Sequence, residues 1–293
     1  MATIETNTKS SLHSRCNSLP STPHPLVSQF EEHLDRLKTS EAASSSSTPS
    51  STISHNFSDL LDLHGCTDKL LRLPITQQAL AQDCCDELLE GSLSLLDVCT
   101  TAKDALHQSK ESIRELQSVV RRRRGGEISL TIEGGKYLAS RKKVKKAILK
   151  ALGNLKGIKN EFISSSSKND KETFSLLSIL KEAEAVTMSS LESLLLFISD
   201  PKGQSKKSRW SIISKLMQHK REACDSQVSD TNEFENVDSA LQCLINHKPL
   251  SVENFKNHME NLEVCIQDLE IGMERLSRQL VRTRVSFLNI FNN

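Results

Sequence analysis

Apolar residues recur every three or four positions along most of the chain, which is the spacing of one face of an α-helix. The first such stretch predicts a helix over 24–41, whose apolar face consists of Leu26, Phe30, Leu34 and Leu37. A second helix is predicted over 53–74, where Pro74 is expected to end it because proline cannot continue a helix.

The longest uninterrupted pattern runs from Thr76 to about Arg122 and contains no proline and one glycine. It predicts either one long helix or two helices in line with a break near Gly91. Gly125 and Gly126 follow at the place where glycine commonly ends a helix.

The stretch EISLTIEGG, residues 127–135, is ambiguous between a loop and a first turn cut short by Gly134 and Gly135. The next helix is therefore predicted from about Tyr137 to Lys159. Its apolar face contains Tyr137, Val144, Ile148, Ala151, Leu152 and Leu155.

Four more helices are predicted in the second half of the chain. They begin near Phe174, at Trp210, near Val237 and after Ser251, which is placed as an N-cap residue. The last of them reaches about Ile290, with inward positions predicted at Phe255, Leu262, Cys265, Leu269, Met273, Leu276, Leu280 and Leu288.

These segments predict an all-α protein, an elongated antiparallel bundle of about seven or eight helices that occupies residues 24–291. Residues 1–23, rich in Ser, Thr and Asn, are predicted to form a disordered tail. Serine-rich linkers are expected at 41–52 and 163–169. Ten glycines and seven prolines in 293 residues are too few for most β-rich folds, which supports long helices.

The eight cysteines follow a polar N-terminus without a secretory signal, which favours a reducing, intracellular compartment and free thiols. They show neither a C-x-x-C motif nor zinc-type spacing, so buried thiols are expected and no metal site. The longest apolar run, Leu194 to Ile198, is far shorter than the roughly 20 residues needed to span a bilayer.

Common catalytic and nucleotide-binding motifs are missing from the sequence, including G-x-S-x-G, the P-loop, G-x-G-x-x-G and H-E-x-x-H. We therefore expect a non-enzymatic protein with no catalytic residues and no cofactor. The competing interpretation is an enzyme or ligand-binding bundle, which requires a polar pocket between its helices.

Positive charge is concentrated in one part of a chain whose net charge is +1. Residues 121–160 hold 13 Lys or Arg and two acids, whereas the segment from Glu222 to the end has a net charge of −6. The predicted basic interaction face consists of Arg121, Arg122, Arg123, Arg124, Lys142, Lys143, Lys145, Lys146 and Lys150.

Several interpretations of this basic face remain open. It can pair internally with the acidic C-terminal helices, or bind an anionic membrane surface. RRRR and RKKVKK also have the density of a nuclear address. Nucleic-acid binding is the least favoured, because the face has one aromatic residue for base stacking and the chain's pI is about 7.6.

Two further stretches suggest protein partners. Arg15 and Pro20 flank Ser18 at the offsets read by basophilic kinases and by 14-3-3 proteins, so Ser18 is a candidate phosphosite. The basic stretch around Trp210 resembles a calmodulin target, but the favoured interpretation of Trp210 is an anchor residue for a core or an interface.

Several strings, in order, resemble the plant-specific BYPASS-like family over nearly the whole chain, among them ELLEGSLSLLDVCTTAKDAL, RRRRGGE, KYLASRKKVKKAILKAL and RTRVSFLNIFN. The resemblance implies a helical plant protein without known enzymatic activity and with a role in root and shoot development. It implies no catalytic residues. A cytoplasmic or peripheral-membrane location is expected, with the nucleus and a DNA-associated role as the alternative.

Overall fold

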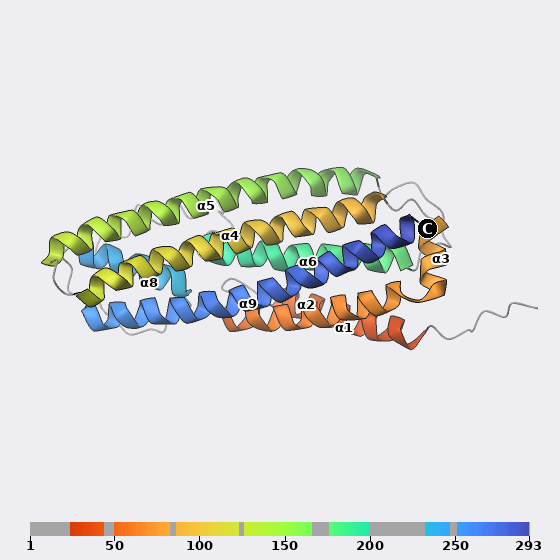
Figure 1. The fold of residues 1–293 in the computed structure, drawn as a ribbon, viewed down its shortest axis with the longest axis horizontal. Helices are drawn as coiled ribbons and strands as arrows, with labels where there is room; N and C mark the ends of the chain where they lie inside the picture. Colours follow the sequence, from red (N-terminus) through yellow and green to blue (C-terminus); the bar gives the residue numbers. More distant parts are fainter. Residues whose placement is uncertain are drawn as a thin grey trace, which may run out of the picture.

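A computed structural model describes residues 24–43, 50–82, 86–122, 126–165, 176–199, 232–246 and 251–292. These residues form eight α-helices and no strand, so the predicted all-α class is confirmed (Figure 1). The helices are α1 (Pro25–Ala43), α2 (Ser50–Leu71), α3 (Pro74–Gln82), α4 (Asp86–Arg122), α5 (Gly126–Ser165), α6 (Leu176–Ser199), α8 (Glu233–Ile245) and α9 (Val252–Phe291).

The long helices lie along one axis of an elongated bundle, and α3 crosses one end (Figure 1). Helix α9 packs most extensively against α4 and α2, and α4 also packs against α5 and α6. Helices α4 and α9 are antiparallel, because Lys103 contacts Glu274 whereas Arg114, further along α4, contacts Glu263, nearer the start of α9.

One large apolar core runs the length of the bundle and is filled by side chains of all the long helices. A smaller apolar cluster lies where α2, α3, α4, α6 and α9 meet, with Leu71, Leu80 and Phe287 among its members. The core is mostly aliphatic, as expected from a chain with 4% aromatic residues.

The helix break predicted near Gly91 is wrong. Gly91 lies inside α4, which begins at Asp86, and a separate helix, α3, ends at Gln82. A side chain at Gly91 would overlap the carboxylate of Glu184 on α6. The glycine therefore makes room for a neighbouring helix and does not end its own.

The start predicted for the basic helix is also wrong. Helix α5 begins at Gly126, eleven residues before Tyr137, and residues 127–135 are helical. Glycine suits position 134 of this helix because α8 packs closely there. A Cβ at Gly134 would lie 2.9 Å from Leu241 Cδ1 of α8. A Cβ at Gly135, by contrast, would have no neighbouring atom within 4 Å.

Smaller differences concern helix ends and one inward position. Parts of both predicted linkers, 41–52 and 163–169, are helical. Helix α1 reaches Ala43, α2 begins at Ser50 and α5 reaches Ser165. Ser251 is the N-cap residue of α9, but its side chain makes no capping hydrogen bond. Leu288, predicted to face inward, is 36% exposed. The predicted tail, residues 1–23, lies outside the described residues.

Candidate functional site

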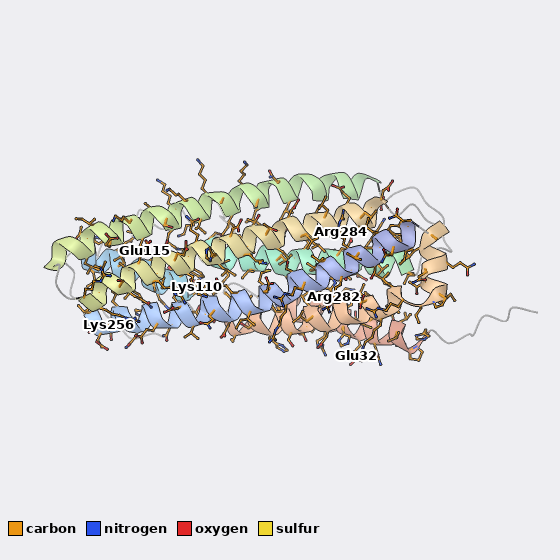
Figure 2. The ribbon with its side chains drawn as sticks, in the orientation of Figure 1. Glu32, Lys110, Glu115, Lys256, Arg282 and Arg284 are labelled. Atoms are coloured by element: carbon orange, nitrogen blue, oxygen red, sulfur yellow. The ribbon has the colours of Figure 1, made fainter. Side chains whose placement is uncertain are left out.

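Four lysines on α5 form a solvent-exposed surface, which we call the α5 lysine face and which consists of Lys142, Lys143, Lys146 and Lys150. It forms because the opposite side of α5 is buried in the bundle through Val144, Ile148 and Leu155. Side chains along the outer edge of α5 point away from the other helices (Figure 2).

The four lysines have no carboxylate within ion-pairing distance in the described part of the chain. Leu149, on the same side of the helix, is 60% exposed. The surface therefore combines four unneutralised cations with an exposed aliphatic side chain, which is a combination suited to an anionic surface with an apolar layer beneath it.

Lys145, predicted as part of the same face, lies apart from it. Its Nζ is 3.4 Å from Asp238 Oδ2 of α8, and the residue is half-buried. The predicted basic face is therefore divided, with Lys145 paired to α8 at the solvent-exposed edge of the bundle and the four neighbouring lysines facing solvent.

Charge pairing with the acidic C-terminal helices involves mainly α4. Lys103 pairs with Glu274 at 2.6 Å, Lys110 pairs with Glu270, and Arg114 Nε lies 3.0 Å from Glu263 Oε1. Gln117 also donates to Glu263, and these hydrogen bonds lower the pKa of Glu263 below its usual value. Internal pairing thus accounts for cations on α4 and for Lys145, but not for the α5 lysine face.

The remaining predicted site residues are placed as follows. Arg121 and Arg122 are exposed in the last turn of α4, where cations are favoured by the helix dipole. Arg123, Arg124, Arg15, Ser18, Pro20 and Trp210 lie outside the described residues, so the phosphosite and calmodulin hypotheses remain predictions.

Arg141, which the sequence analysis missed, is the most buried cation among the described residues, with 2% exposure. Its Nε lies 3.3 Å from Asp238 Oδ1 of α8, and its Nη2 donates to the Ile198 carbonyl of α6 at 2.9 Å. Its guanidinium also lies over the ring of Phe234, 4.5 Å from the centroid. Its position in the apolar stripe between Tyr137 and Val144 was the sequence signal.

Arg141 and Asn232 satisfy carbonyls at the C-terminal end of α6, which lack partners within the helix. Asn232 Nδ2 donates to the Phe197 carbonyl at 2.7 Å, and its Oδ1 accepts from the Glu235 amide to cap α8. Burial raises the pKa of the adjacent Tyr137 well above its usual value, with the Asp238 charge adding to the effect. This cluster joins α5, α6 and α8.

A second buried polar cluster lies between α2, α4, α6 and α9. Thr187 Oγ1 donates to the Ala183 carbonyl at 2.7 Å and so accepts from His64 Nε2 at 2.9 Å. Burial lowers the pKa of His64 to about 4 and raises that of Glu184 to about 8, so both side chains are neutral near pH 7. They line a cavity of about 20 Å³, which is room for about one water molecule.

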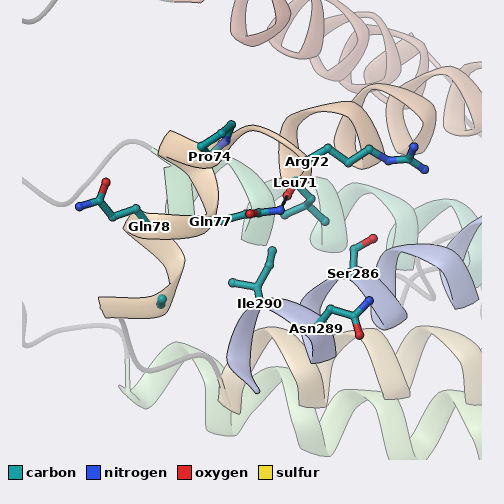
Figure 3. Close-up of a pocket in the computed structure, with 9 residues that line it drawn as sticks. Leu71, Arg72, Pro74, Gln77, Gln78, Ser286, Asn289 and Ile290 are labelled. Atoms are coloured by element: carbon teal, nitrogen blue, oxygen red, sulfur yellow. Dashed lines mark hydrogen bonds between the residues drawn. The ribbon is translucent and has the colours of Figure 1, made fainter. Parts of the chain in front are cut away.

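A surface groove of about 580 Å³ lies at one end of the bundle, between the α2–α3 corner and the end of α9 (Figure 3). Leu71 and Ile290 line it together with Gln77, Gln78 and Asn289. Gln77 Nε2 donates to the Leu71 carbonyl at 3.1 Å, which fixes the corner. Arg72 at its edge is paired with Asp68 at 2.7 Å.

The described residues contain no group of three or more His, Cys, Asp or Glu arranged to hold a metal ion. The four cysteines that the structure describes are free thiols, and Cys66, Cys99 and Cys265 are buried as expected. Burial raises the pKa of both Cys99 and Cys265 to about 12, which keeps these thiols protonated and unreactive.

No helix in the described segments is both long enough and apolar enough to cross a bilayer. No match was found among curated proteins or among solved structures. The family model described as Protein BPS1 matches residues 56–290, which is well over half of the chain. The match begins within α2 and ends one residue before the end of α9. The chain therefore belongs to the BPS1 family, in agreement with its resemblance to BYPASS-like proteins.

Proposed function

We propose that this chain is a non-enzymatic regulatory adaptor of plants that acts in root and shoot development and attaches to an anionic membrane surface inside the cell through the α5 lysine face. Membership of the BPS1 family supports the developmental role. The observation that carries the attachment is the set of four exposed lysines without described ion-pair partners.

The lysines are presented on a helix that is already folded and packed. Val144 and Ile148 hold α5 in the bundle while Lys142, Lys146 and Lys150 repeat every four residues on its outer side. Each cation near an anionic leaflet contributes about 1 kcal/mol, so four contribute about 4 kcal/mol without unfolding the helix. The exposed Leu149 adds an apolar contact at the headgroup level.

A non-enzymatic role is supported by the contents of the two described pockets. The interior cavity of about 20 Å³ is smaller than any organic substrate. The surface groove offers a guanidinium, amides and the Ser286 hydroxyl, but no carboxylate, imidazole or thiol as an acid, base or nucleophile.

The proposal is tested by co-sedimentation of the purified protein with vesicles of phosphatidylcholine, with and without phosphatidylserine. We expect binding only to the anionic vesicles and a steep loss of binding as salt rises. Lys142→Glu with Lys146→Glu should abolish it. The control, Lys69→Glu with Arg275→Glu, makes the same change in net charge at exposed positions of α2 and α9 and should bind as the unsubstituted protein does.

Failure of the unsubstituted protein to bind anionic vesicles at low salt would refute membrane attachment. Equal loss of binding in the control variant would show that overall charge, and not the α5 lysine face, is responsible. A tagged protein carrying the Lys142 and Lys146 substitutions should also leave membranes in plant cells while remaining folded.

A further inference from the structure

One side of helix α9 packs in the bundle, and the buried residues on it are regularly spaced. Eleven of its twelve buried residues recur every seven positions in two series, and Cys265 is the twelfth. This is the spacing of helices that pack side by side over a long distance. The two series are Phe255, Leu262, Leu269, Leu276, Thr283 and Ile290, and Met259, Ile266, Met273, Leu280 and Phe287.

The opposite side of α9 carries a second series with the same spacing, which we call the outer seam. It alternates steps of three and four residues and faces away from the core, except that Glu274 is half-buried and also pairs with Lys103 of α4. Its members are Val264, Gln267, Ile271, Glu274, Arg278, Val281, Val285 and Leu288.

Five of the eight outer-seam residues are apolar and exposed. Val264 is 62% exposed, Val285 is 49% exposed, and both Ile271 and Val281 are 47% exposed. The solvent-facing side of a bundle helix is ordinarily polar, since apolar side chains there contribute nothing to its own core. Aliphatic groups repeated at this spacing indicate a surface that packs against another helix.

The charged residues of the outer seam identify the occupant. Glu274 and Arg278 lie at its centre, on either side of Leu276, and the apolar residues lie towards both ends. Such an arrangement is complementary to itself when it is turned end for end. A second copy of this chain supplies an opposite charge for each central charge and an aliphatic group for each outer aliphatic one except Val285, which faces Gln267.

We propose that two copies of this chain associate through the outer seam of α9 in antiparallel orientation, with the two-fold axis crossing the outer seam at the level of the core residue Leu276. Positions equally distant from Leu276 then face each other across the interface. Val264 faces Leu288 of the second copy, Gln267 faces Val285, Ile271 faces Val281, and Glu274 faces Arg278.

The orientation follows from the charges. In a parallel pair Arg278 would face Arg278 and Glu274 would face Glu274, and like charges facing each other across an interface cost several kcal/mol. In the antiparallel pair each Arg278, now 2.8 Å from Glu274 of its own helix, gains a second glutamate. At the rim, the exposed Asp268 and the exposed Arg282 of the second copy lie along the same edge of the interface, two residues from exact opposition.

This interface is independent of the proposed membrane attachment, because it uses α9 and leaves the α5 lysine face free. The first test is sedimentation equilibrium of the full chain over two orders of magnitude in concentration. The unsubstituted protein should show a monomer–dimer equilibrium. Ile271→Asp with Val281→Asp should weaken the dimer by about a hundredfold or more, since it places like charges opposite each other.

These two positions are exposed, so the variant should keep the unsubstituted protein's circular dichroism and melting temperature. As a matched control, Val252→Asp changes an exposed valine of α9 outside the outer seam and should leave the dimer intact. A monomeric unsubstituted protein throughout the concentration range, or a dimer unaffected by the double substitution, would overturn the proposal.

A charge exchange tests the register. Arg278→Glu alone and Glu274→Arg alone should each give a monomer, whereas an equimolar mixture of the two variants should form a mixed dimer. Val264→Cys mixed with Leu288→Cys should also give a cross-linked peptide containing both new cysteines, identified by mass spectrometry. A mixed dimer that fails to form, or a cross-link of 264 to 264, would exclude the antiparallel register.

Discussion

Arg141 and Lys145 lie one helical turn apart on α5 and contact the same aspartate, yet their surroundings differ. The Arg141 side chain is 3% exposed and also holds the Ile198 carbonyl and the Phe234 ring. The Lys145 side chain is 37% exposed and makes the single contact with Asp238. Removal of one partner of a buried charge pair leaves the other uncompensated, whereas an exposed pair is screened by solvent.

We therefore expect Arg141→Met to lower the free energy of unfolding by about 3–5 kcal/mol. Lys145→Met, the matched control, should lower it by about 0–1 kcal/mol. Arg141→Lys should rescue little, because an ammonium group cannot reach Asp238 and the Ile198 carbonyl with the planar geometry of guanidinium. Urea unfolding monitored by circular dichroism measures all three, and equal losses for Met at both positions would contradict the argument.

Helix positions were predictable from the spacing of apolar residues, because burial of one face requires a period of 3.6 wherever the helix packs. The errors occurred at Gly91 and at Gly134, where local propensity and tertiary packing conflict. Glycine favours a helix end in isolation, but here each one admits a neighbouring helix, Glu184 of α6 or Leu241 of α8. That information lies in residues far away in the sequence.

The same limit applies to the site. The exposure of Lys142 and Lys146 followed from the helical wheel, since they lie opposite Val144 and Ile148. Pairing of Lys145 with Asp238 did not follow, because it depends on α8 packing against α5. Arg141 was missed for the same reason.

The glycine pair on α5 gives a prediction at the level of helix packing. Gly135→Ala should raise the free energy of unfolding by about 0.5–1 kcal/mol, since alanine favours the helix and its Cβ meets nothing within 4 Å. Gly134→Leu should lower it by about 1–3 kcal/mol, because the side chain is forced against Leu241 and Ile245. Thermal and urea unfolding of both variants measure this difference, and a stabilising Gly134→Leu would show that α8 does not pack closely there.

Across the whole molecule, the buried ionisable groups make stability depend on pH. Glu184 has a pKa of about 8 in the folded protein and an ordinary value of 4.5, so the folded state holds this proton more tightly than the unfolded state does. Its effect on stability is therefore absent below pH 4.5 and increasingly unfavourable as pH rises to about 8. His64, with a pKa of about 4 against 6.5, costs stability as pH falls through that range.

Glu184→Gln should remove the first effect. Relative to the unsubstituted protein, this variant should gain stability between pH 4.5 and about 8, by an amount on the order of a few kcal/mol at the upper end. Glu260→Gln, at an exposed position of α9, is the control and should follow the unsubstituted protein. Urea midpoints across this pH range provide the measurement, and parallel curves for Glu184→Gln and the unsubstituted protein would contradict the assignment.

The packing of α2 against α9 has a consequence for how the chain is made. Gln279 donates to the His64 carbonyl and Ser286 to Asp68, across 215 and 218 residues of sequence. At ribosomal rates of synthesis, α9 is made roughly 10–40 s after α2. During that time α9 cannot cover Phe57, whose ring packs against Gly272, so the nascent chain presents part of the apolar face of α2 to chaperones until synthesis reaches α9.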